Sequence, residues 1–190
     1  MFTTSWDYYS IYNYLEKPPA EKNELNNIFP LEVNITILDI FDIDERDSSF
    51  DVYFVLNIKW WDARVTFQWL KDEVEERILN EAEYSKLWLP EIEFTHIASP
   101  THKVDFERQI IITKNASKLS GDNDELHVKE IYEGINNPIN LIVKNRIRFT
   151  CSFDNIQSYP FKKQICLMNF YIKEGCFIAY DEFYKLIIEH

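Results

Sequence analysis

Cysteines are the residues of this chain with the most distinctive chemistry, and two of them frame a loop. Cys151 and Cys166 bound the stretch "CSFDNIQSYPFKKQIC", a spacing far wider than the Cys-x-x-Cys of redox and zinc motifs. The four histidines form no pair at metal-ligand spacing. Cys176 stands alone and is expected to be a small buried apolar residue. Two interpretations of Cys151 and Cys166 remain: a disulfide that closes the loop, or separate thiols in a reducing compartment.

No catalytic constellation is visible in the sequence. Ser, His and Asp residues cannot be assembled into a triad from sequence alone, and the adjacent carboxylates Glu75 and Glu76 are typical of a solvated helix face. The chain has only three glycines, so it lacks the Gly-rich loop that cradles a phosphate. We therefore expect a protein that is not an enzyme, with no cofactor and no metal site.

Charge and hydropathy limit the partners. The net charge is −12, from 32 acidic and 20 basic residues, which disfavours nucleic acid. An acidic surface suits cationic small molecules or basic proteins, and it also serves solubility. No apolar run is long enough to cross a bilayer, and "MFTTSWDYYS" has no export signal, so we expect no membrane contact from this chain alone. The sequons Asn34-Ile35-Thr36 and Asn115-Ala116-Ser117 are consistent with secretion.

Alternating apolar residues predict a long hairpin near the start of the chain. Residues 31–43 alternate until the phase slips, which indicates a β-bulge near Asp39. Residues 50–60 alternate without interruption, and residues 44–49 form the turn between the two strands. The hairpin is the clearest structural prediction that the sequence offers.

Strands dominate the rest of the predicted elements. Helices are expected at 4–17, followed by a connector to residue 30, and on the surface at 72–84. Turns are expected at 120–124 and 133–138. Further strands are expected at 89–96, 106–114, 126–132, 139–150, 164–172 and 176–188. Many short strands with little helix predict an all-β, immunoglobulin-like sandwich over 31–190, within one domain that covers 1–190.

The end of the cysteine-framed loop carries a specific resemblance. It reads Tyr-Pro-Phe-Lys-Lys-Gln-Ile-Cys, and the signature loop of the Cys-loop pentameric receptors ends aromatic-Pro-Phe-Asp-x-Gln-x-Cys. The matching residues are Tyr159, Pro160, Phe161, Gln164 and Cys166. This chain has one extra residue in the loop, and Lys162 replaces the usual Asp. The segment resembles the ligand-binding domain of those receptors and of acetylcholine-binding proteins, and the resemblance implies a Cys151–Cys166 disulfide.

Two more motifs and the hairpin follow the order of the same family. "WWDAR" is similar to the family's Trp-x-Asp-x-Arg, and "LWLPEIEF" to its Trp-x-Pro-Asp, with Glu91 for Asp. The matching residues are Trp60, Asp62, Arg64, Trp88 and Pro90. The resemblance implies a sandwich of about ten strands behind an N-terminal helix. Both tryptophans are expected to be structural and buried beside the core.

The resemblance also implies where a ligand would bind, and there this chain departs from the family. Family sites lie between subunits and surround a cationic or amine ligand with aromatic rings. Thr95 and Val55 stand where loops A and D offer aromatics. Phe177 and Tyr180 can match loop B only after a shift in the alignment. We expect them to be core or hairpin aromatics rather than ligand contacts. The chain stops at His190, before the final hairpin that carries loop C, so we expect that hairpin to be absent.

The sequence supports two functions. The first is a ligand-binding ectodomain or soluble binding protein that assembles with like or related subunits in a ring, by resemblance a pentamer. The second is a structural subunit of the same fold that binds a protein at an exposed sheet edge. The first places the chain outside the cell or at its surface, and the second allows an intracellular site. With Thr95 and Val55 in place of aromatic rings, we expect this chain alone not to bind acetylcholine-like amines with appreciable affinity.

Overall fold

The computed structural model describes the chain in separate stretches, and all statements below concern these: residues 19, 31–44, 46–68, 70–98, 104–116, 118–119, 130–151, 164–172 and 184–188. The predicted helix at 4–17 and the turn at 120–124 lie outside them, as does nearly all of the connector to residue 30. Among the described residues, no helix is long and apolar enough to cross a membrane.

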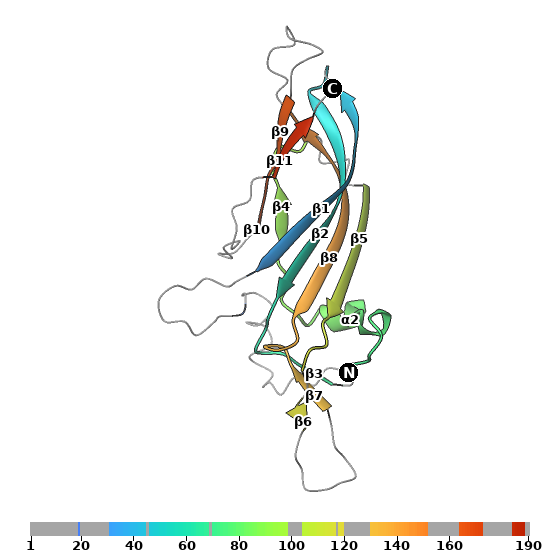
Figure 1. Ribbon diagram of the computed structural model, residues 1–190, viewed down its shortest axis with the longest axis vertical. Helices are drawn as coiled ribbons and strands as arrows, with labels where there is room; N and C mark the ends of the chain where they lie inside the picture. The colour runs from blue at the N-terminus through green and yellow to red at the C-terminus, as the bar shows by residue number, and fades with distance from the viewer. Residues whose placement is uncertain are drawn as a thin grey trace, which may run out of the picture.

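A long antiparallel sheet forms one layer of the molecule. Its four strands lie in the order β1, β2, β8, β5, so the hairpin predicted from the sequence is present at one side (Figure 1). The bounds are β1 Glu32–Asp44, β2 Ser49–Trp60, β8 Ile139–Thr150 and β5 Val104–Ile112. The prediction of a strand at 139–150 is confirmed.

Alternation of side chains along these strands builds the core. On β2, Phe54, Leu56 and Ile58 are fully buried while the residues between them are partly exposed, because successive side chains point to opposite faces. The predicted bulge is confirmed: pairing with β2 passes from Ile37 directly to Asp39 and leaves Leu38 between them. We call the side of this sheet turned away from the core the outward face.

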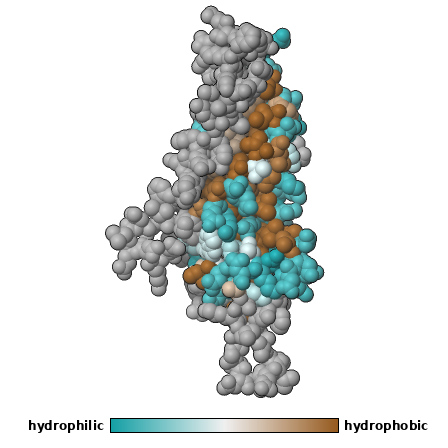
Figure 2. All heavy atoms as spheres, in the orientation of Figure 1, coloured by the Kyte–Doolittle hydropathy of each residue, from teal (hydrophilic) through white to brown (hydrophobic). Residues whose placement is uncertain are grey.

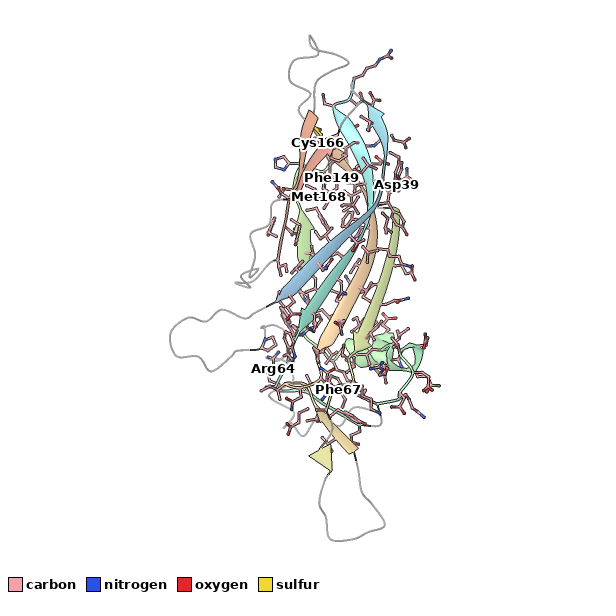
Figure 3. All side chains as sticks on the ribbon, in the orientation of Figure 1. Asp39, Arg64, Phe67, Phe149, Cys166 and Met168 are labelled. Carbon is pink, nitrogen blue, oxygen red and sulfur yellow. A yellow bond between two sulfur atoms is a disulfide. The ribbon has the colours of Figure 1, made fainter. Side chains whose placement is uncertain are left out.

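Shorter strands form the opposing layer. β4 (Ile92–Phe94) pairs with β10 (Phe170–Ile172), and β9 (Gln164–Met168) pairs with β11 (Tyr184–Ile188). The ring of Phe94 meets that of Phe54 edge to face at 5.4 Å, so the two layers share one aromatic core. Phe149, Cys166 and Met168 lie together in this core (Figure 3). The all-β sandwich fold is confirmed.

A small third sheet lies at one end of the long sheet (Figure 1). Its strands β3 (Thr66–Gln68), β7 (Glu130–Glu133) and β6 (Lys118–Leu119) pair antiparallel in the order β3, β7, β6. The turn after β7 is the one predicted at 133–138.

The surface helix predicted over 72–84 is wrong. That segment contains a 3₁₀ turn, η1 (Glu75–Arg77), and a four-residue helix, α2 (Glu81–Tyr84), separated by an extended stretch. In this stretch Ile78 bridges to Ile111, and the backbone N–H of Leu79 donates to the carbonyl of Ile110 at 2.8 Å. Pairing with β5 satisfies backbone groups that a continuous helix would have bonded internally, so tertiary contact overrides the helical pattern.

Several strands are shorter than the sequence predicts. The strand at 89–96 is only Ile92–Phe94, and the one at 164–172 is interrupted at Asn169. β7 and β11 cover parts of the strands predicted at 126–132 and 176–188, whose other residues lie outside the described stretches. β5 begins two residues earlier than predicted and ends at Ile112.

Candidate ligand-binding site

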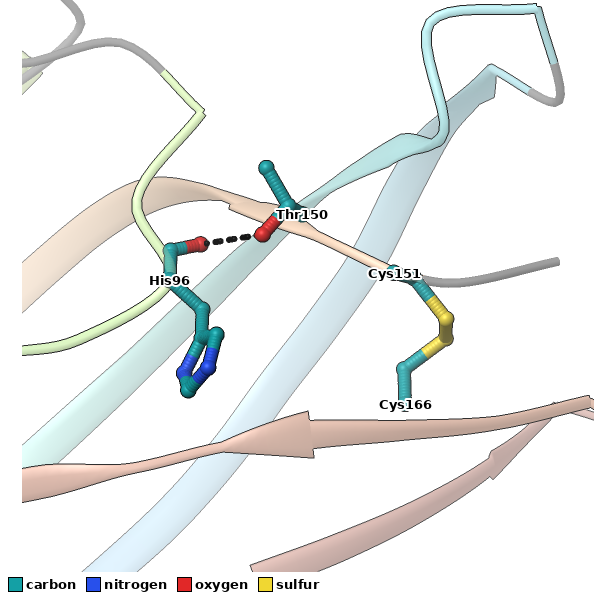
Figure 4. The surroundings of a disulfide bond; sticks show 4 residues. All are labelled: His96, Thr150, Cys151 and Cys166. Atoms are coloured by element: carbon teal, nitrogen blue, oxygen red, sulfur yellow. Dashed lines mark hydrogen bonds between the residues drawn. A yellow bond between two sulfur atoms is a disulfide. The ribbon is translucent and has the colours of Figure 1, made fainter.

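A disulfide joins the two layers of the sandwich. Cys151, directly after β8, is bonded to Cys166 on β9, and their Cα atoms are 5.2 Å apart (Figure 4). Both cysteines are buried. The disulfide that the sequence resemblance implies is therefore present, and it fixes the start and the end of the intervening loop.

Backbone hydrogen bonds hold the first cysteine in place. The N–H of Cys151 donates to the carbonyl of Ser48, at the tip of the β1–β2 hairpin, at 2.8 Å. The N–H and hydroxyl of Thr150 both donate to the carbonyl of His96, at 2.7 and 3.1 Å (Figure 4). His96 has a φ of 58°, in the left-handed region. The disulfide thus lies where the hairpin tip, β8 and the segment after β4 meet.

The tryptophans of the two sequence motifs pack together. Trp60 and Trp88 are 0% and 3% exposed, and their rings meet edge to face with centroids 6.0 Å apart. Pro90, two residues after Trp88, is also buried. Both tryptophans lie in the core, as the sequence predicts, so the motifs specify packing rather than a surface site.

Asp62 and Arg64 form a local ion pair in the turn after β2. The guanidinium donates to both carboxylate oxygens, from Nε at 2.9 Å and from Nη2 at 3.0 Å. The backbone N–H of Arg64 also donates to the same carboxylate, which is 1% exposed. Arg64 lies near the end of the molecule opposite to Cys166 (Figure 3). Two-pronged pairs of this kind fix geometry as well as charge.

Val55 occupies the outward face beside a charged pair. Its direct partners across the sheet are Thr36 on β1 and Lys144 on β8, at side-chain separations of about 5 Å. Lys144 donates to the carboxylate of Glu107 on β5 at 2.6 Å, and this hydrogen bond raises the pKa of Lys144. The position that the sequence resemblance assigns to a loop D aromatic thus has an aliphatic side chain, and its cross-strand partner is a lysine paired with the next strand.

Thr95 is engaged in hydrogen bonds within the chain. Its backbone N–H donates to the carbonyl of Asn169 at 2.9 Å, and its hydroxyl lies 3.4 Å from the same oxygen. The hydroxyl is also 3.0 Å from Nδ1 of His96. Thr95, which the sequence resemblance assigns to loop A, therefore links the end of β4 to the break between β9 and β10.

An exposed aromatic and an acid on the same strands escaped the sequence predictions. Glu93 lies two residues before Thr95 on β4, and Tyr171 on β10 is its direct partner across the ladder. The tyrosine is 46% exposed, and its hydroxyl donates to the Glu93 carboxylate. In the sequence, Glu93 is marked only by its alternation with Phe94, which packs against the core. The pairing with Tyr171 could not be predicted, because it joins residues far apart in the chain.

A cluster of charged side chains lies on the outward face near the hairpin tip. Asp51 is 6% exposed and accepts hydrogen bonds from Arg148 at 2.5 Å and from Arg146 at 3.0 and 3.2 Å. Burial alone would raise the pKa of Asp51, but the hydrogen bonds and charges of the two arginines outweigh it and lower that pKa. Arg146 also lies over the ring of Phe41, 4.3 Å from its centroid.

Hydrophobic side chains accompany these charges on the surface. Figure 2 shows, on the face in view, a band of hydrophobic side chains along the strands with hydrophilic ones beside it. Of the outward face itself, Val55, Ile142 and Ile111 contribute apolar, partly exposed side chains on three neighbouring strands. The outward face is thus a mixed surface of aliphatic residues and paired charges.

Some predicted site residues lie outside the described stretches. These are Tyr159, Pro160, Phe161, Phe177 and Tyr180. Gln164 begins β9, and its side chain is not described. Within the described residues, no three His, Cys, Asp or Glu side chains gather as a metal ion would require.

Comparison with known proteins gives one family. No curated protein matches the sequence. The family described as neurotransmitter-gated ion-channel ligand binding domain matches residues 5–172, which is most of the chain. Its members are non-enzymatic extracellular domains of membrane receptors and form pentameric assemblies of related subunits. With the sandwich and the disulfide-closed loop in place, this match shows that the chain belongs to the family of neurotransmitter-gated ion-channel ligand-binding domains.

Proposed function

We propose that this chain is a receptor-type ligand-binding subunit that assembles with like or related subunits and contributes a ligand site without the aromatic box. The observation that carries the proposal is the environment of Val55. This outward-facing position has no ring, and its direct cross-strand partner is Lys144, whose ammonium group is paired with Glu107 on β5. The subunit acts extracellularly and is not an enzyme.

The energetic consequence is a weak response to acetylcholine-like amines. A cation–π contact contributes about 0.5–2 kcal/mol, and both Val55 and Thr95 replace aromatics of the family site. Two lost contacts remove about 1–4 kcal/mol, or roughly one to three decades of affinity. Lys144 adds like-charge repulsion toward a cationic ligand, reduced by its pairing with Glu107.

Calorimetric titration of the whole chain with choline and with a primary amine tests this proposal. We expect no binding in the micromolar range. Micromolar affinity that disappears in Phe177→Ala would restore the family-type site and overturn the proposal. Tyr171→Ala tests the exposed aromatic of β10 in the same titration. Loss of micromolar binding in that variant alone would place the ligand against Tyr171 and Glu93.

A gain-of-binding variant tests whether Val55 faces a ligand. Val55→Trp returns one ring to the outward face, and Lys144→Gln removes the neighbouring charge. Together they are expected to raise choline affinity by about twofold to thirtyfold, which is the range of one cation–π contact. Gln109→Trp places a ring on β5, in the row next to Lys144 and Glu107, and serves as the matched control. An equal gain in the control would show that position 55 is not special.

Assembly is tested separately by light scattering of the purified chain. We expect an oligomer built through the outward face, because Val55, Ile142 and Ile111 offer apolar area framed by charges. Ile142→Arg should reduce assembly, whereas Leu38→Arg, at the exposed bulge residue of β1, should not. A monomer that binds no amine would favour the alternative, a structural subunit that binds a protein at the β1 edge, which pairs only with β2 among the described strands.

A further inference from the structure

The sequon Asn34-Ile35-Thr36 lies within β1, at the margin of the long sheet. Asn34 and Thr36 are both exposed, and Ile35 between them turns toward the core. The residue that would carry a modification and the residue that completes the sequon therefore lie on the same, solvent-facing side of the strand. We propose that Asn34 is an N-glycosylation site.

The surroundings of Asn34 leave room for a sugar. It lies opposite Asn57 on β2, and no described strand lies on its other side. Within the described stretches, no hydrogen bond holds its side chain. Because Asn34 is exposed and β1 is the margin of the described sheet, the attached group can extend over the outward face or past that margin.

The second sequon contrasts with the first. The amide nitrogen of Asn115 donates to the carbonyl of Asn136 at 3.1 Å. The side chain of the buried Asn137 accepts from the backbone N–H groups of Asn115 and Ala116 and donates to the carbonyl of Ala116. A glycan on Asn115 would have to be accommodated beside these bonds, so Asn34 is the favoured acceptor.

The compartment fits the chemistry. The Cys151–Cys166 disulfide forms in an oxidising environment, and the family is extracellular. During secretion, a protein with an accessible sequon meets the enzyme that transfers an oligosaccharide from a polyprenyl diphosphate to the asparagine side chain. In that transfer the amide nitrogen of Asn34 bonds to the anomeric carbon and loses one proton. The bond from that carbon to the diphosphate oxygen breaks, and the lipid diphosphate leaves.

The modification would change which surfaces can take a partner. An unpaired strand edge invites pairing with another chain, and covering the edge prevents it. A glycan on Asn34 would shield the β1 edge. Assembly would then use the part of the outward face nearer β8 and β5.

Secretion of the whole chain from a eukaryotic cell line, behind a cleavable leader, tests the proposal. Treatment with peptide N-glycosidase should increase gel mobility and leave Asp at position 34 in peptide mass maps. Asn34→Gln and Thr36→Ala should each abolish the mobility shift. Thr36→Ser, which keeps the sequon, should retain it, and Asn115→Gln should retain it as the matched control.

The peptide map of the parent chain decides the proposal even if a variant fails to be secreted. An unmodified Asn34 peptide in the secreted parent would overturn the proposal. So would a mobility shift that is lost only in Asn115→Gln.

Discussion

Trp60 is the largest side chain that the described core removes entirely from solvent. Its ring packs on Trp88 from the opposing motif, so truncation would leave a cavity between the two segments. We expect Trp60→Ala to lower the free energy of unfolding by about 3–5 kcal/mol, as large core truncations do. Denaturant unfolding measures this, with Trp61→Ala as the neighbouring control. If Trp60→Ala unfolds like the parent, Trp60 does not support the core.

Asp51 offers a prediction about pH. Its folded-state pKa is lowered, so its contribution to stability is present above its unfolded pKa and is lost as the pH falls below about 4. Asp51→Asn should cost about 1–3 kcal/mol at neutral pH, reduced from the value for a fully buried pair because both arginines are partly exposed.

The difference in stability between the parent and Asp51→Asn should therefore shrink as the pH is lowered from 5 toward 3. Urea unfolding at a series of pH values checks this. A difference that stays constant over the series would mean that the ionised carboxylate is not what stabilises the cluster.

Gly134 is required by close packing of two turns. A Cβ atom at this position would lie 2.3 Å from the backbone carbonyl oxygen of Asp62, and the Gly134 N–H already donates to Val65. We expect Gly134→Ala to destabilise the fold by about 1–3 kcal/mol, because the obstacle is backbone and cannot rotate away. Thermal unfolding measures it, with Asn136→Ala in the same turn as control. Equal melting of Gly134→Ala and the parent would contradict the contact.

At the scale of elements, the disulfide connects β8 to β9 and so joins the two layers. Replacing Cys151 and Cys166 together by Ser should cost about 3 kcal/mol, the value for closing a loop of about 15 residues. The measurement is denaturant unfolding of the double variant against the parent, both without reductant. Adding reductant to the parent should lower its stability to that of the variant. A parent that is insensitive to reductant would contradict a stabilising role.

At the scale of the whole molecule, net charge opposes self-association. Each chain carries −12, so copies that approach one another repel at low ionic strength. We expect assembly to strengthen as salt is raised from about 0.01 M to 0.15 M, where the Debye length falls from about 30 Å to 8 Å. Sedimentation velocity over this series measures it. Dissociation with added salt would instead show that ion pairs across the interface dominate.

Local patterns in the sequence predicted the parts of the fold that depend on residues close together in the chain. The alternation on β2, the bulge after Ile37 and the bounds of β8 could be predicted because side-chain period and backbone geometry are local properties. The tryptophan motifs and the loop between Cys151 and Cys166 pointed to the family from residue order alone.

Pairing between distant segments decided the rest. Ile78 and Leu79 have a helical pattern, yet they extend along β5 because that edge offers backbone partners. The sequence by itself determined the β1–β2 hairpin with its bulge, the strand β8, the burial of Trp60 and Trp88 and the absence of rings at Val55 and Thr95. Only the tertiary structure placed Lys144 beside Val55 and Tyr171 beside Glu93, because the register between strands is set by contacts that no local stretch of sequence contains.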